Sequence, residues 1–392
     1  MEHCKLKATR FLVVPDSFKG TLSAERAAEA IRQGILAVNA DAEVRCFPLA
    51  DGGEGSSSIA ANSIAARRIE LSVTGPEGEV VDGFYYSNGK TALIELAAAS
   101  GFTQSNKPKK TAAVATTYGT GQLIAHAIEH GAKTIRVFLG GSATTDGGVG
   151  MARALGARFF AADGNELVAI QAAGFAGEQL DRIADYDDQP LRAKLAGVNV
   201  AAVVDVDNPL CGPNGAAHTY GPQKGADAST VLELDAALRS FAKVVAKKRG
   251  SDEQNTAGVG AAGGAGFGVL TLLGGALIPG SAFFLDLIEF DRQLSQIDVV
   301  ITGEGQADWQ SLHGKLLNEI VSRTATSKTP VVSLCGKNAL TEEELRDFPH
   351  TRVFGMRRPD AMTNAFPALK ELAEVVVARL GEKDKNRSYE TH

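Results

Sequence analysis

A glycine-rich and hydroxyl-rich segment stands where the sequence places the end of a buried strand. The apolar, β-branched run 134–139 is followed by Gly-Gly-Ser-Ala-Thr-Thr-Asp-Gly-Gly at 140–148, and residues 149–155 then favour a helix. A strand, a loop of exposed backbone N–H groups and a helix N-terminus together suit an anion. In open α/β sheets, ligands bind at the carboxyl ends of strands, and phosphates are common among them. The segment therefore predicts an enzyme that handles phosphate.

Acidic residues and lysines follow several other apolar runs, mostly within glycine-rich loops. Phosphoryl transfer needs this mixture, because carboxylates hold Mg²⁺ and accept the proton of an attacking hydroxyl, while lysines and N–H groups neutralise the transferring phosphoryl. Any one of these carboxylates could instead be a helix N-cap or a solvated loop charge. Their repeated position favours a shared function. The acidic residues are Asp16, Asp51, Asp146, Asp205, Glu304 and Asp308, and the lysines are Lys19, Lys224 and Lys315.

Two other glycine strings resemble nucleotide-binding motifs but stand in the wrong context. Gly-x-Gly-x-x-Gly at 258–263 fits the dinucleotide fingerprint, which must follow a buried strand, whereas the polar stretch 250–257 precedes it. The string 83–91 has one residue too many for a Walker A loop, and its Asn88-Gly89 pair predicts a type I′ hairpin turn. A nicotinamide-linked oxidoreductase is therefore a weak alternative.

The first 70 residues alternate strands with helices. Run 10–14 is typical of a buried strand, run 43–47 of a second strand, and the alanine-rich segment from about 21 to 36 between them predicts a helix. Either Thr21 or Ser23 can cap that helix, because a hydroxyl oxygen can accept a hydrogen bond from an unpaired N–H of the first turn. This repeated strand, loop and helix pattern predicts a parallel, doubly wound sheet.

The pattern changes in the middle of the chain and returns near its end. Between about 70 and 96 the expected strands are short and joined by tight turns, which predicts an antiparallel section. The runs 298–302 and 330–336 again favour buried strands. We therefore expect an α/β protein in which one domain is built from both chain ends and the other is inserted. The expected domains are 1–70 with 290–383, and 71–289, followed by a disordered tail at 384–392.

Composition argues against several classes of partner. The 392 residues are 44% hydrophobic, enough for two cores, and 40 Lys and Arg against 46 Asp and Glu leave a net charge of -6, which does not favour nucleic acid. The four cysteines are far apart and lack metal-ligand spacing, which fits a reducing cytosol. The apolar run 11–14 is too short for a signal peptide or a membrane span. We expect a cytoplasmic protein with small-molecule substrates and no membrane partner.

Taken together, the motifs resemble those of the type-1 glycerate kinase family, in family order and over nearly the whole chain. The resemblance implies ATP-dependent phosphorylation of a hydroxyl of D-glycerate, with Mg²⁺ as cofactor and the 2-hydroxyl favoured as acceptor. It also implies a flavodoxin-like domain and a mixed-sheet domain with the active site between them, and it leaves the oligomeric state open. The matching segments are 15–24, 49–55, 94–101, 116–121, 140–148, 205–215, 221–226, 260–266 and 303–315.

Two positions depart from the family pattern. The family commonly has Asn where Thr145 stands and Arg where Gln306 stands. Thr145 keeps a hydrogen-bonding group, but Gln306 lacks a fixed positive charge, which implies weaker anion binding or a different partner group there. The only tryptophan, Trp309, either packs against the protein or shapes the substrate pocket. The loss of charge leaves a second interpretation open, a non-catalytic or regulatory carboxylate-binding protein that keeps the kinase fold.

The resemblance and the chemistry together assign the candidate residues to roles. The loop at 140–148 is expected to cradle phosphates, with Lys19 or Lys315 as the charged clamp. Asp51 and Asp205 are candidates for Mg²⁺ binding and for the general base, in either assignment, and Asp146 and Glu304 are alternatives for these roles. The predicted groups are catalytic, Asp51, Asp205, Lys19 and Lys315; cofactor-binding, Gly140, Gly141, Ser142, Thr144, Asp146 and Lys224; substrate-binding, Asp16, Ser17, Glu304, Gln306 and Asp308; and metal-binding, Asp205 and Glu304.

Overall fold

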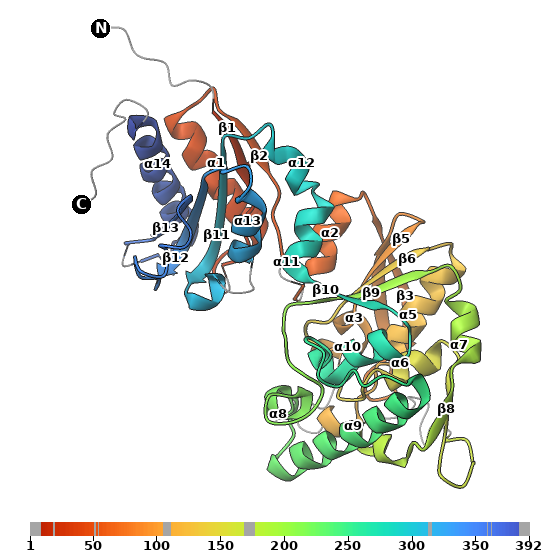
Figure 1. Ribbon diagram of the computed structural model, residues 1–392. Helices are drawn as coiled ribbons and strands as arrows, with labels where there is room; N and C mark the ends of the chain where they lie inside the picture. The colour runs from red at the N-terminus through yellow and green to blue at the C-terminus, as the bar shows by residue number, and fades with distance from the viewer. Residues whose placement is uncertain are drawn as a thin grey trace, which may run out of the picture. The chain divides into compact units, whose positions relative to one another are not determined.

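The chain divides into two compact units, which Figure 1 shows in a computed structural model. The split unit comprises Met1–Asp51 with Ser281–His392, and the inserted unit comprises Gly52–Gly280. The division differs from the expected one near residue 70, because helix α2 (Ser56–Ser63) belongs to the inserted unit, where the Ser57 N–H donates to Glu95 Oε1 at 3.0 Å. It differs near residue 290, because residues 281–289 belong to the split unit, where Asp286 accepts from Arg323 at 2.6 Å. The structure describes residues 9–18, 20–50, 52–53, 55–104, 111–167, 177–312, 316–358, 360–361 and 363–383.

The split unit is built on a five-stranded, fully parallel sheet. Its strands are β1 (Arg10–Val13), β2 (Glu43–Cys46), β11 (Val299–Ala307), β12 (Val331–Asn338) and β13 (Thr351–Gly355), in the spatial order β13-β12-β11-β1-β2. Counted along the unit, this is the order 2-1-3-4-5 of flavodoxin-like sheets. The predicted fold class is confirmed for this unit. The switch in strand order lies between β1 and β11, and ligands bind outside the carboxyl ends of such neighbours.

Helices of the split unit cover its sheet on both sides. Helix α1 (Ala24–Val38) begins at Ser23, whose hydroxyl accepts from the Arg26 N–H at 3.3 Å, so Ser23 rather than Thr21 is the cap. Helix α1 and helix α14 (Ala365–Lys383) pack together, with Ile31 and Leu369 buried against strand residues. The remaining helices are α11 (Gly280–Leu287), α12 (Phe290–Leu294) and α13 (Leu316–Thr324).

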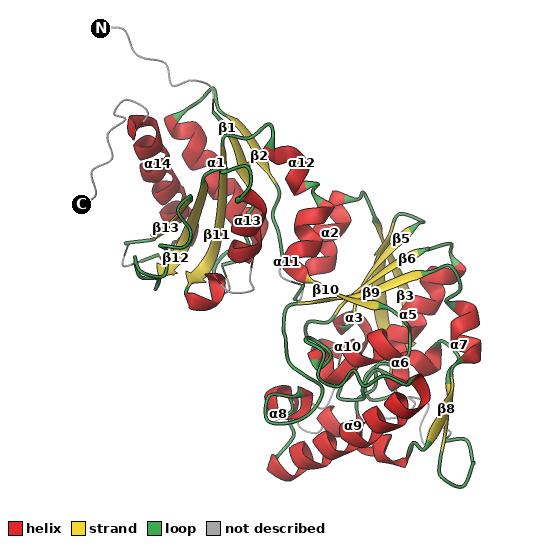
Figure 2. Ribbon diagram, in the orientation of Figure 1, coloured by secondary structure: helices red, strands yellow, loops and turns green. Residues whose placement is uncertain are grey.

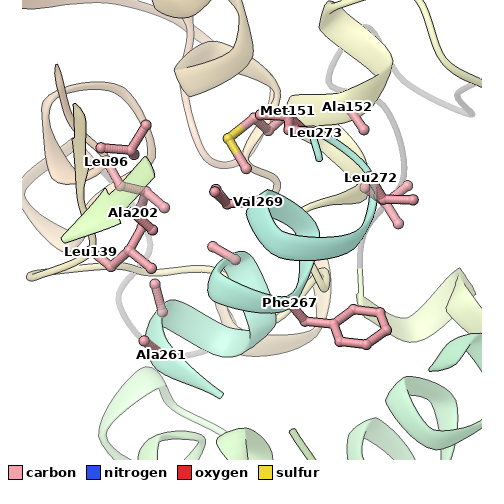
Figure 3. Close-up of a cluster of buried hydrophobic side chains, with 14 of the residues drawn as sticks. Leu96, Leu139, Met151, Ala152, Ala202, Ala261, Phe267, Val269, Leu272 and Leu273 are labelled. Atoms are coloured by element: carbon pink, nitrogen blue, oxygen red, sulfur yellow. The ribbon is translucent and has the colours of Figure 1, made fainter. Parts of the chain in front are cut away.

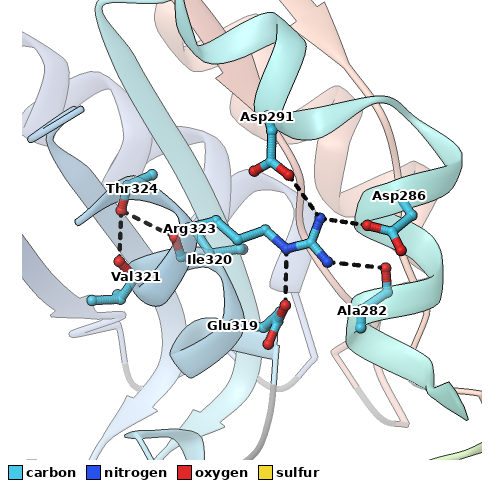
Figure 4. A network of polar contacts seen from close by, with 8 residues as sticks. All are labelled: Ala282, Asp286, Asp291, Glu319, Ile320, Val321, Arg323 and Thr324. Carbon is cyan, nitrogen blue, oxygen red and sulfur yellow. Dashed lines mark hydrogen bonds and ion pairs between the residues drawn. The ribbon is translucent and has the colours of Figure 1, made fainter. Parts of the chain in front are cut away.

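One arginine joins these last three helices. Arg323 of α13 donates to Asp286 of α11 at 2.6 Å, to Asp291 of α12 at 3.3 Å and to Glu319 of its own helix at 2.8 Å (Figure 4). A further N–H donates to the backbone carbonyl of Ala282 at 3.4 Å. Because the guanidinium presents donors in a planar fork, one side chain can satisfy groups from all three helices.

The inserted unit contains a six-stranded mixed sheet. Its strands, in spatial order, are β10 (Ala276–Pro279), β9 (Asn199–Val204), β6 (Thr134–Phe138), β5 (Thr91–Glu95), β4 (Val80–Ser87) and β3 (Arg67–Thr74). Strands β10, β9, β6 and β5 are parallel, whereas β4 pairs antiparallel with both β5 and β3.

The antiparallel section is confirmed, and a hairpin turn does lie at Asn88-Gly89, but it is not the expected type I′ turn. A type I′ turn needs positive φ at both central residues, whereas Gly89 has φ +87° and Asn88 is not among the described non-glycine residues with positive φ. The Asn88 N–H donates to the Thr91 carbonyl at 3.2 Å, so Gly89 is the first central residue of the turn, where a type II′ turn has glycine.

A large apolar core lies under the parallel half of this sheet (Figure 3). Ala202 comes from the sheet, Leu139 directly follows β6, and Met151 comes from a helix, residues 149–154. Phe267 and Val269 come from a glycine-rich helix packed on the sheet. Figure 2 shows several helices of the inserted unit lying beside this sheet. Besides α2, the helices are α3 (Ala97–Ser100), α4 (Thr111–Val114), α5 (Tyr118–Glu129), α6 (Val149–Ala154), α7 (Gln189–Lys194), α8 (Ala216–Tyr220), α9 (Ala228–Arg249) and α10 (Ala261–Thr271), and a ribbon of β7 (Arg158–Phe160) and β8 (Asp185–Asp187) lies apart.

A search of the described residues for a helix of membrane-spanning length and apolarity finds none. The last nine residues, 384–392, for which a disordered tail was expected, lie outside the described residues.

Candidate active site

Four parallel strands of the inserted unit end at one edge of its sheet, and the candidate phosphate loop begins there. The register pairs Phe138 of β6 with Val203 of β9, so Gly140 and Asp205, each two residues further on, follow neighbouring strands at the same level. Paired strands are about 5 Å apart. Asp205 is exposed, and the strand register places its backbone beside the start of the loop.

The loop itself is mostly internal. Gly141 is exposed and Gly140 half-buried, whereas residues 142–148 are all buried. The Ala143 N–H donates to the Ser100 carbonyl at 3.0 Å, and the Gly147 N–H donates to the Gly263 carbonyl at 3.1 Å. The protein thus uses much of the loop to hold its own shape, and only the first residues face solvent. A phosphate would meet Gly140, Gly141 and the adjoining side of Ser142.

Asp146 organises this loop from inside. Its carboxylate is fully buried and accepts from both the N–H and the hydroxyl of Thr117 at 2.8 Å. Three more donors are Gly148 N–H at 3.1 Å, Gly150 N–H at 3.2 Å and Thr116 Oγ1 at 3.4 Å. Burial raises the pKa of Asp146, and the hydrogen bonds from Thr117, Gly148 and Gly150 oppose that rise because they favour the carboxylate. Any influence of Asp146 on a bound phosphate must pass through the loop.

Lys224 supports the same loop from beneath. It ends a short 3₁₀ turn, Pro222–Lys224, and is 2% exposed. Its ammonium donates to Ser142 Oγ at 2.8 Å and to the Thr144 carbonyl at 2.7 Å. Burial lowers the pKa of Lys224 to about 7, and the nearby Asp146 carboxylate acts in the opposite direction. The predicted cofactor-binding residues Ser142, Thr144, Asp146 and Lys224 therefore form one internal cluster.

The glycine string at 258–263 is part of this cluster and forms no dinucleotide site. Residues 251–260 contain no strand, so the context that the fingerprint requires is absent from this described segment. Gly263, at φ +66°, lies against Thr144, and an added Cβ there would overlap the Thr144 carbonyl oxygen. Gly148 lies against Gly268 in the same way, with 2.8 Å between an added Cβ and the Gly268 Cα. These glycines allow two backbones to pack in direct contact.

Two threonines of the loop carry buried hydroxyls. Thr144 and Thr145 are both inaccessible to solvent, and within the described part of the chain neither Oγ1 has a hydrogen-bond partner. A buried hydroxyl without a partner is unfavourable, so such groups mark positions where a ligand or an ordered water fits. Thr144 was predicted to touch the cofactor, and Thr145 is one of the two departures from the family pattern.

The carboxyl edge of the split unit gathers the predicted substrate-binding residues. The Asp16 N–H donates to the Gly303 carbonyl at 2.9 Å, which places the loop after β1 beside β11. The Ser17 N–H donates to Asp16 Oδ1 at 2.6 Å, and both side chains are half-buried. Asp16, Ser17 and Glu304 therefore lie together at the strand-order switch between β1 and β11.

Strand β11 is longer than expected, and this changes how its polar residues are presented. The sequence analysis ended the strand before Gly303, but β11 continues to pair with β12 as far as Ala307. Glu304 and Gln306 are therefore strand residues on one face of the sheet, and not loop residues. Gln306 is exposed and donates to Asp308 Oδ2 at 3.3 Å. Asp308 Oδ1 accepts from the Ser311 N–H at 3.3 Å, which fixes the turn after the strand.

Three predicted catalytic residues, Lys19, Asp51 and Lys315, lie outside the described residues. Each of them has described neighbours in the chain, and those that follow residues 51 and 315 bear on the site. Gly52 lies against Val203 and Gly280, so the chain directly after residue 51 reaches the carboxyl ends of β9 and β10. Helix α13 begins at Leu316, directly after residue 315.

Some residues that shape the site were not singled out by the sequence analysis. Thr117 holds Asp146, and its hydroxyl also accepts from the Met151 N–H at 2.9 Å. Glu95, at the end of β5, accepts from the Ser57 N–H at the start of α2. The available signal was position, because Thr117 precedes a glycine-rich helix and Glu95 ends an apolar strand.

Comparison with known proteins places these features in a family context. Residues 11–382 match the glycerate kinase family. A "Glycerate kinase" of Bacillus subtilis is 41% identical over 329 residues, covering 83% of this chain and 85% of that protein. A "Glycerate 2-kinase" of Escherichia coli is 39% identical over 338 residues, covering 85% and 86%. A crystal structure provisionally assigned as glycerate kinase 2 of Salmonella typhimurium LT2 has a TM-score of 0.80 at 35% identity, covering 97% of this chain and 100% of that chain.

Proposed function

Because the chain belongs to the glycerate kinase family, we propose that it transfers the γ-phosphoryl of ATP to the 2-hydroxyl of D-glycerate. The relative from Escherichia coli that is named for the 2-position favours that hydroxyl. The observation that carries the proposal is the pairing of β6 with β9, which sets the turn of half-buried Gly140 and exposed Gly141 beside the exposed Asp205. A backbone turn suited to a phosphate and a carboxylate at one sheet edge are two of the parts that phosphoryl transfer requires, and they support the proposal.

The nucleotide phosphates are proposed to bind at the exposed start of the loop. Gly140 and Gly141 present backbone to solvent, and Ser142 Oγ is held by Lys224. A bound phosphate would favour the charged form of Lys224, because an anion nearby stabilises an ammonium. The lysine would then add positive potential behind the loop without direct contact. Lys19 and Lys315 remain the proposed clamps that touch the phosphoryl group itself.

The donor set fits a Mg²⁺ ion that is bound together with the nucleotide. Among the described residues, no group of three or more His, Cys, Asp or Glu side chains is arranged to hold a metal. Mg²⁺ usually keeps several waters and binds through one or two carboxylates plus substrate phosphates. Asp205 is suited to this role by its exposure beside the loop, and Glu304 is the second candidate. When bound, Mg²⁺ would neutralise charge on the phosphate oxygens.

The acceptor is proposed to bind at the carboxyl edge of the split unit. Asp16, Ser17 and Glu304 can accept hydrogen bonds from the two hydroxyls of glycerate and so orient the one that attacks. The pKa of an alcohol is far above 7, so a base accepts the proton late, when the bond to phosphorus is already forming. Positioning then contributes more than basicity. Asp51 and Asp205 are the candidate bases.

Phosphorus NMR tests the proposal directly. Protein incubated with ATP, Mg²⁺ and D-glycerate should produce a new phosphomonoester signal that is absent when glycerate is omitted. The 2-carbon bears one hydrogen and the 3-carbon bears two, so the 2-phosphate gives a doublet and the 3-phosphate a triplet. A triplet would contradict the proposed position. ATP left unchanged while D-glycerate still binds would support the carboxylate-binding protein instead.

A further inference from the structure

The paired ends of β11 and β12 set a lysine beside Gln306. The register joins Gln306 to Lys337 and Ala307 to Asn338, so both strands remain paired to the carboxyl edge of the sheet. Beyond the strands, the Ala339 N–H donates to the Ala307 carbonyl at 2.8 Å, and the Leu340 N–H donates to Asn338 Oδ1 at 3.0 Å. The backbone that carries Lys337 is therefore fixed on both sides of this residue.

Lys337 shares a sheet face with Glu304 and Gln306. Side chains alternate between faces along a strand, and residues in register on neighbouring strands point to the same face. The residues that alternate with these along the two strands, among them Ile301 and Leu334, point to the opposite face and belong to the core that α1 and α14 cover. Glu304, Gln306 and Lys337 therefore form a row on the other face, at the end of the sheet where the acceptor is proposed to bind.

The carboxyl edge of the split unit carries several carboxylates, so an anionic ligand could bind there only beside a cation. The described residues at the carboxyl ends of β1 and β11 include the carboxylates of Asp16, Glu304 and Asp308, which repel an anionic ligand. Lys337 is exposed, is the only described cation at the carboxyl ends of β1, β11 and β12, and forms no hydrogen bond or ion pair with any described residue. Lys19 and Lys315, outside the described residues, follow the same strands in sequence.

We propose that Lys337 binds an anionic oxygen of a substrate, either the carboxylate of the acceptor or a phosphoryl oxygen of the nucleotide. The inference rests on the proposed function and specifies a residue for it that the motifs did not indicate. Gln306 alone can offer only a neutral amide at this position. The ammonium on the neighbouring strand supplies the charge, and the flexible four-carbon stem of lysine lets it reach along the row.

Kinetics of Lys337→Gln test the proposal. Loss of a charged hydrogen bond should raise one KM about 10-fold to 100-fold. A rise in the KM for D-glycerate would identify the carboxylate, and a rise in the KM for ATP would identify a phosphoryl oxygen. The control is Arg352→Gln, which removes an exposed cation from the same sheet near its opposite, amino edge. Unchanged KM values for both substrates in Lys337→Gln would overturn the proposal.

Charge relocation separates the effect of the charge from a structural effect. Neighbouring strands are about 5 Å apart, so Gln306→Arg introduced into Lys337→Gln returns a cation to the same row. The double variant and the conservative variant Lys337→Arg should both recover most of the lost affinity. A defect that neither of them repairs would show that the positive charge is not what matters, and the proposal would fail.

A direct binding measurement tests this inference separately from the proposed function, because binding does not require turnover. Trp309 is the only tryptophan, is 57% exposed and lies two residues beyond β11, so its fluorescence reports on this edge. Titration with D-glycerate and with inorganic phosphate should show weaker binding in Lys337→Gln for at least one of them. If Lys337→Gln binds an anion more weakly than the wild-type protein does, but the wild-type protein makes no phosphoglycerate, the proposed function fails and the anion site stands. If the wild-type protein and Lys337→Gln bind each of the two anions equally well, the site is refuted, whatever the turnover.

Discussion

The two carboxyl edges of this protein prepare for a ligand in different ways. In the inserted unit, loop residues 142–148 are buried and bonded to the protein, and the parts that reach solvent are the turn at Gly140-Gly141 and Asp205. In the split unit, Gln306 and Lys337 stand in register on strands that continue to the edge. The first edge depends on the shape of its backbone and the second on its side chains. Substitutions in the buried loop of the first edge should therefore reduce the stability of the protein, whereas substitutions at the second edge should mainly reduce its affinity for a ligand.

The largest expected effect tests the packing of the phosphate loop. Gly263→Ala places a Cβ into the Thr144 carbonyl, while Gly164→Ala introduces a Cβ that meets nothing within 4 Å. Both glycines have positive φ, so both variants carry a backbone strain of roughly 1–2 kcal/mol, and overpacking adds about 1–3 kcal/mol at Gly263. Urea unfolding should show the larger loss for Gly263→Ala. Equal losses would mean that the loop can move away, and the contrast between the edges would be lost.

The next effect concerns catalysis at the inserted unit. Asp205→Asn removes a carboxylate proposed to bind Mg²⁺ or to act as the base, and kcat should fall about 100-fold or more. Asp207→Asn is the matched control, because it removes an exposed carboxylate two residues further on. The free energy of unfolding should hardly change in either variant. Similar kcat values for the two variants would remove Asp205 from the site.

A pH dependence should distinguish the buried lysine from exposed ones. The pKa of Lys224 in the folded protein, about 7, lies below its ordinary value of 10.5 because of burial. Between these pH values the unfolded chain binds more protons, so Lys224 makes the free energy of unfolding rise with pH, by up to about 1.4 kcal/mol per unit. We expect the free energy of unfolding, measured with urea from pH 7 to 9, to lose this rise in Lys224→Met and to keep it in Lys243→Met. Identical slopes in the two variants would contradict a buried, neutral lysine.

The smallest expected difference compares one polar side chain from each edge. Ser142→Ala removes the buried oxygen that accepts from Lys224, which should lower the free energy of unfolding by about 1–3 kcal/mol. Gln306→Ala removes an exposed amide and should change it by less than about 0.5 kcal/mol. Thermal unfolding of both variants tests the difference. A larger loss for Gln306→Ala would reverse the comparison.

Much of the fold was predictable because local patterns agree with it. The β-branched run before Gly140 forms β6, and a hairpin turn lies at the Asn88-Gly89 pair, although its type differs from the expected one. The extension of β11 was not predictable in this way, since Gly303 and Gly305 read locally as a loop. An added Cβ at Gly336 would stand 2.5 Å from the Gly305 carbonyl oxygen, so glycine here permits close pairing of β11 with β12. Tertiary pairing overrides the local preference of these residues.

The sequence indicated which residues gather at the loop but not how they hold it. Four residues that were predicted to bind the cofactor form one cluster in the structure, where Lys224 donates to Ser142 and to the Thr144 carbonyl. The buried carboxylate of Asp146 accepts from Thr117, 29 residues earlier in the chain, and no local pattern reports such a contact. Lys337 was missed for a similar reason, because its neighbour Gln306 is set by strand register and not by sequence spacing.

The split unit also has a consequence for biosynthesis. Strand β1 pairs on one side with β11, and the Arg10 N–H bonds to an aspartate 288 residues further along the chain. At about 5–20 residues per second, a ribosome needs roughly 15–60 s to produce that partner. During this time the inserted unit can be completed, whereas β1 lacks its neighbour and the apolar side chains of Phe11 and Val13 lack part of their core. The amino-terminal segment is therefore the part of the nascent chain on which a chaperone would act longest.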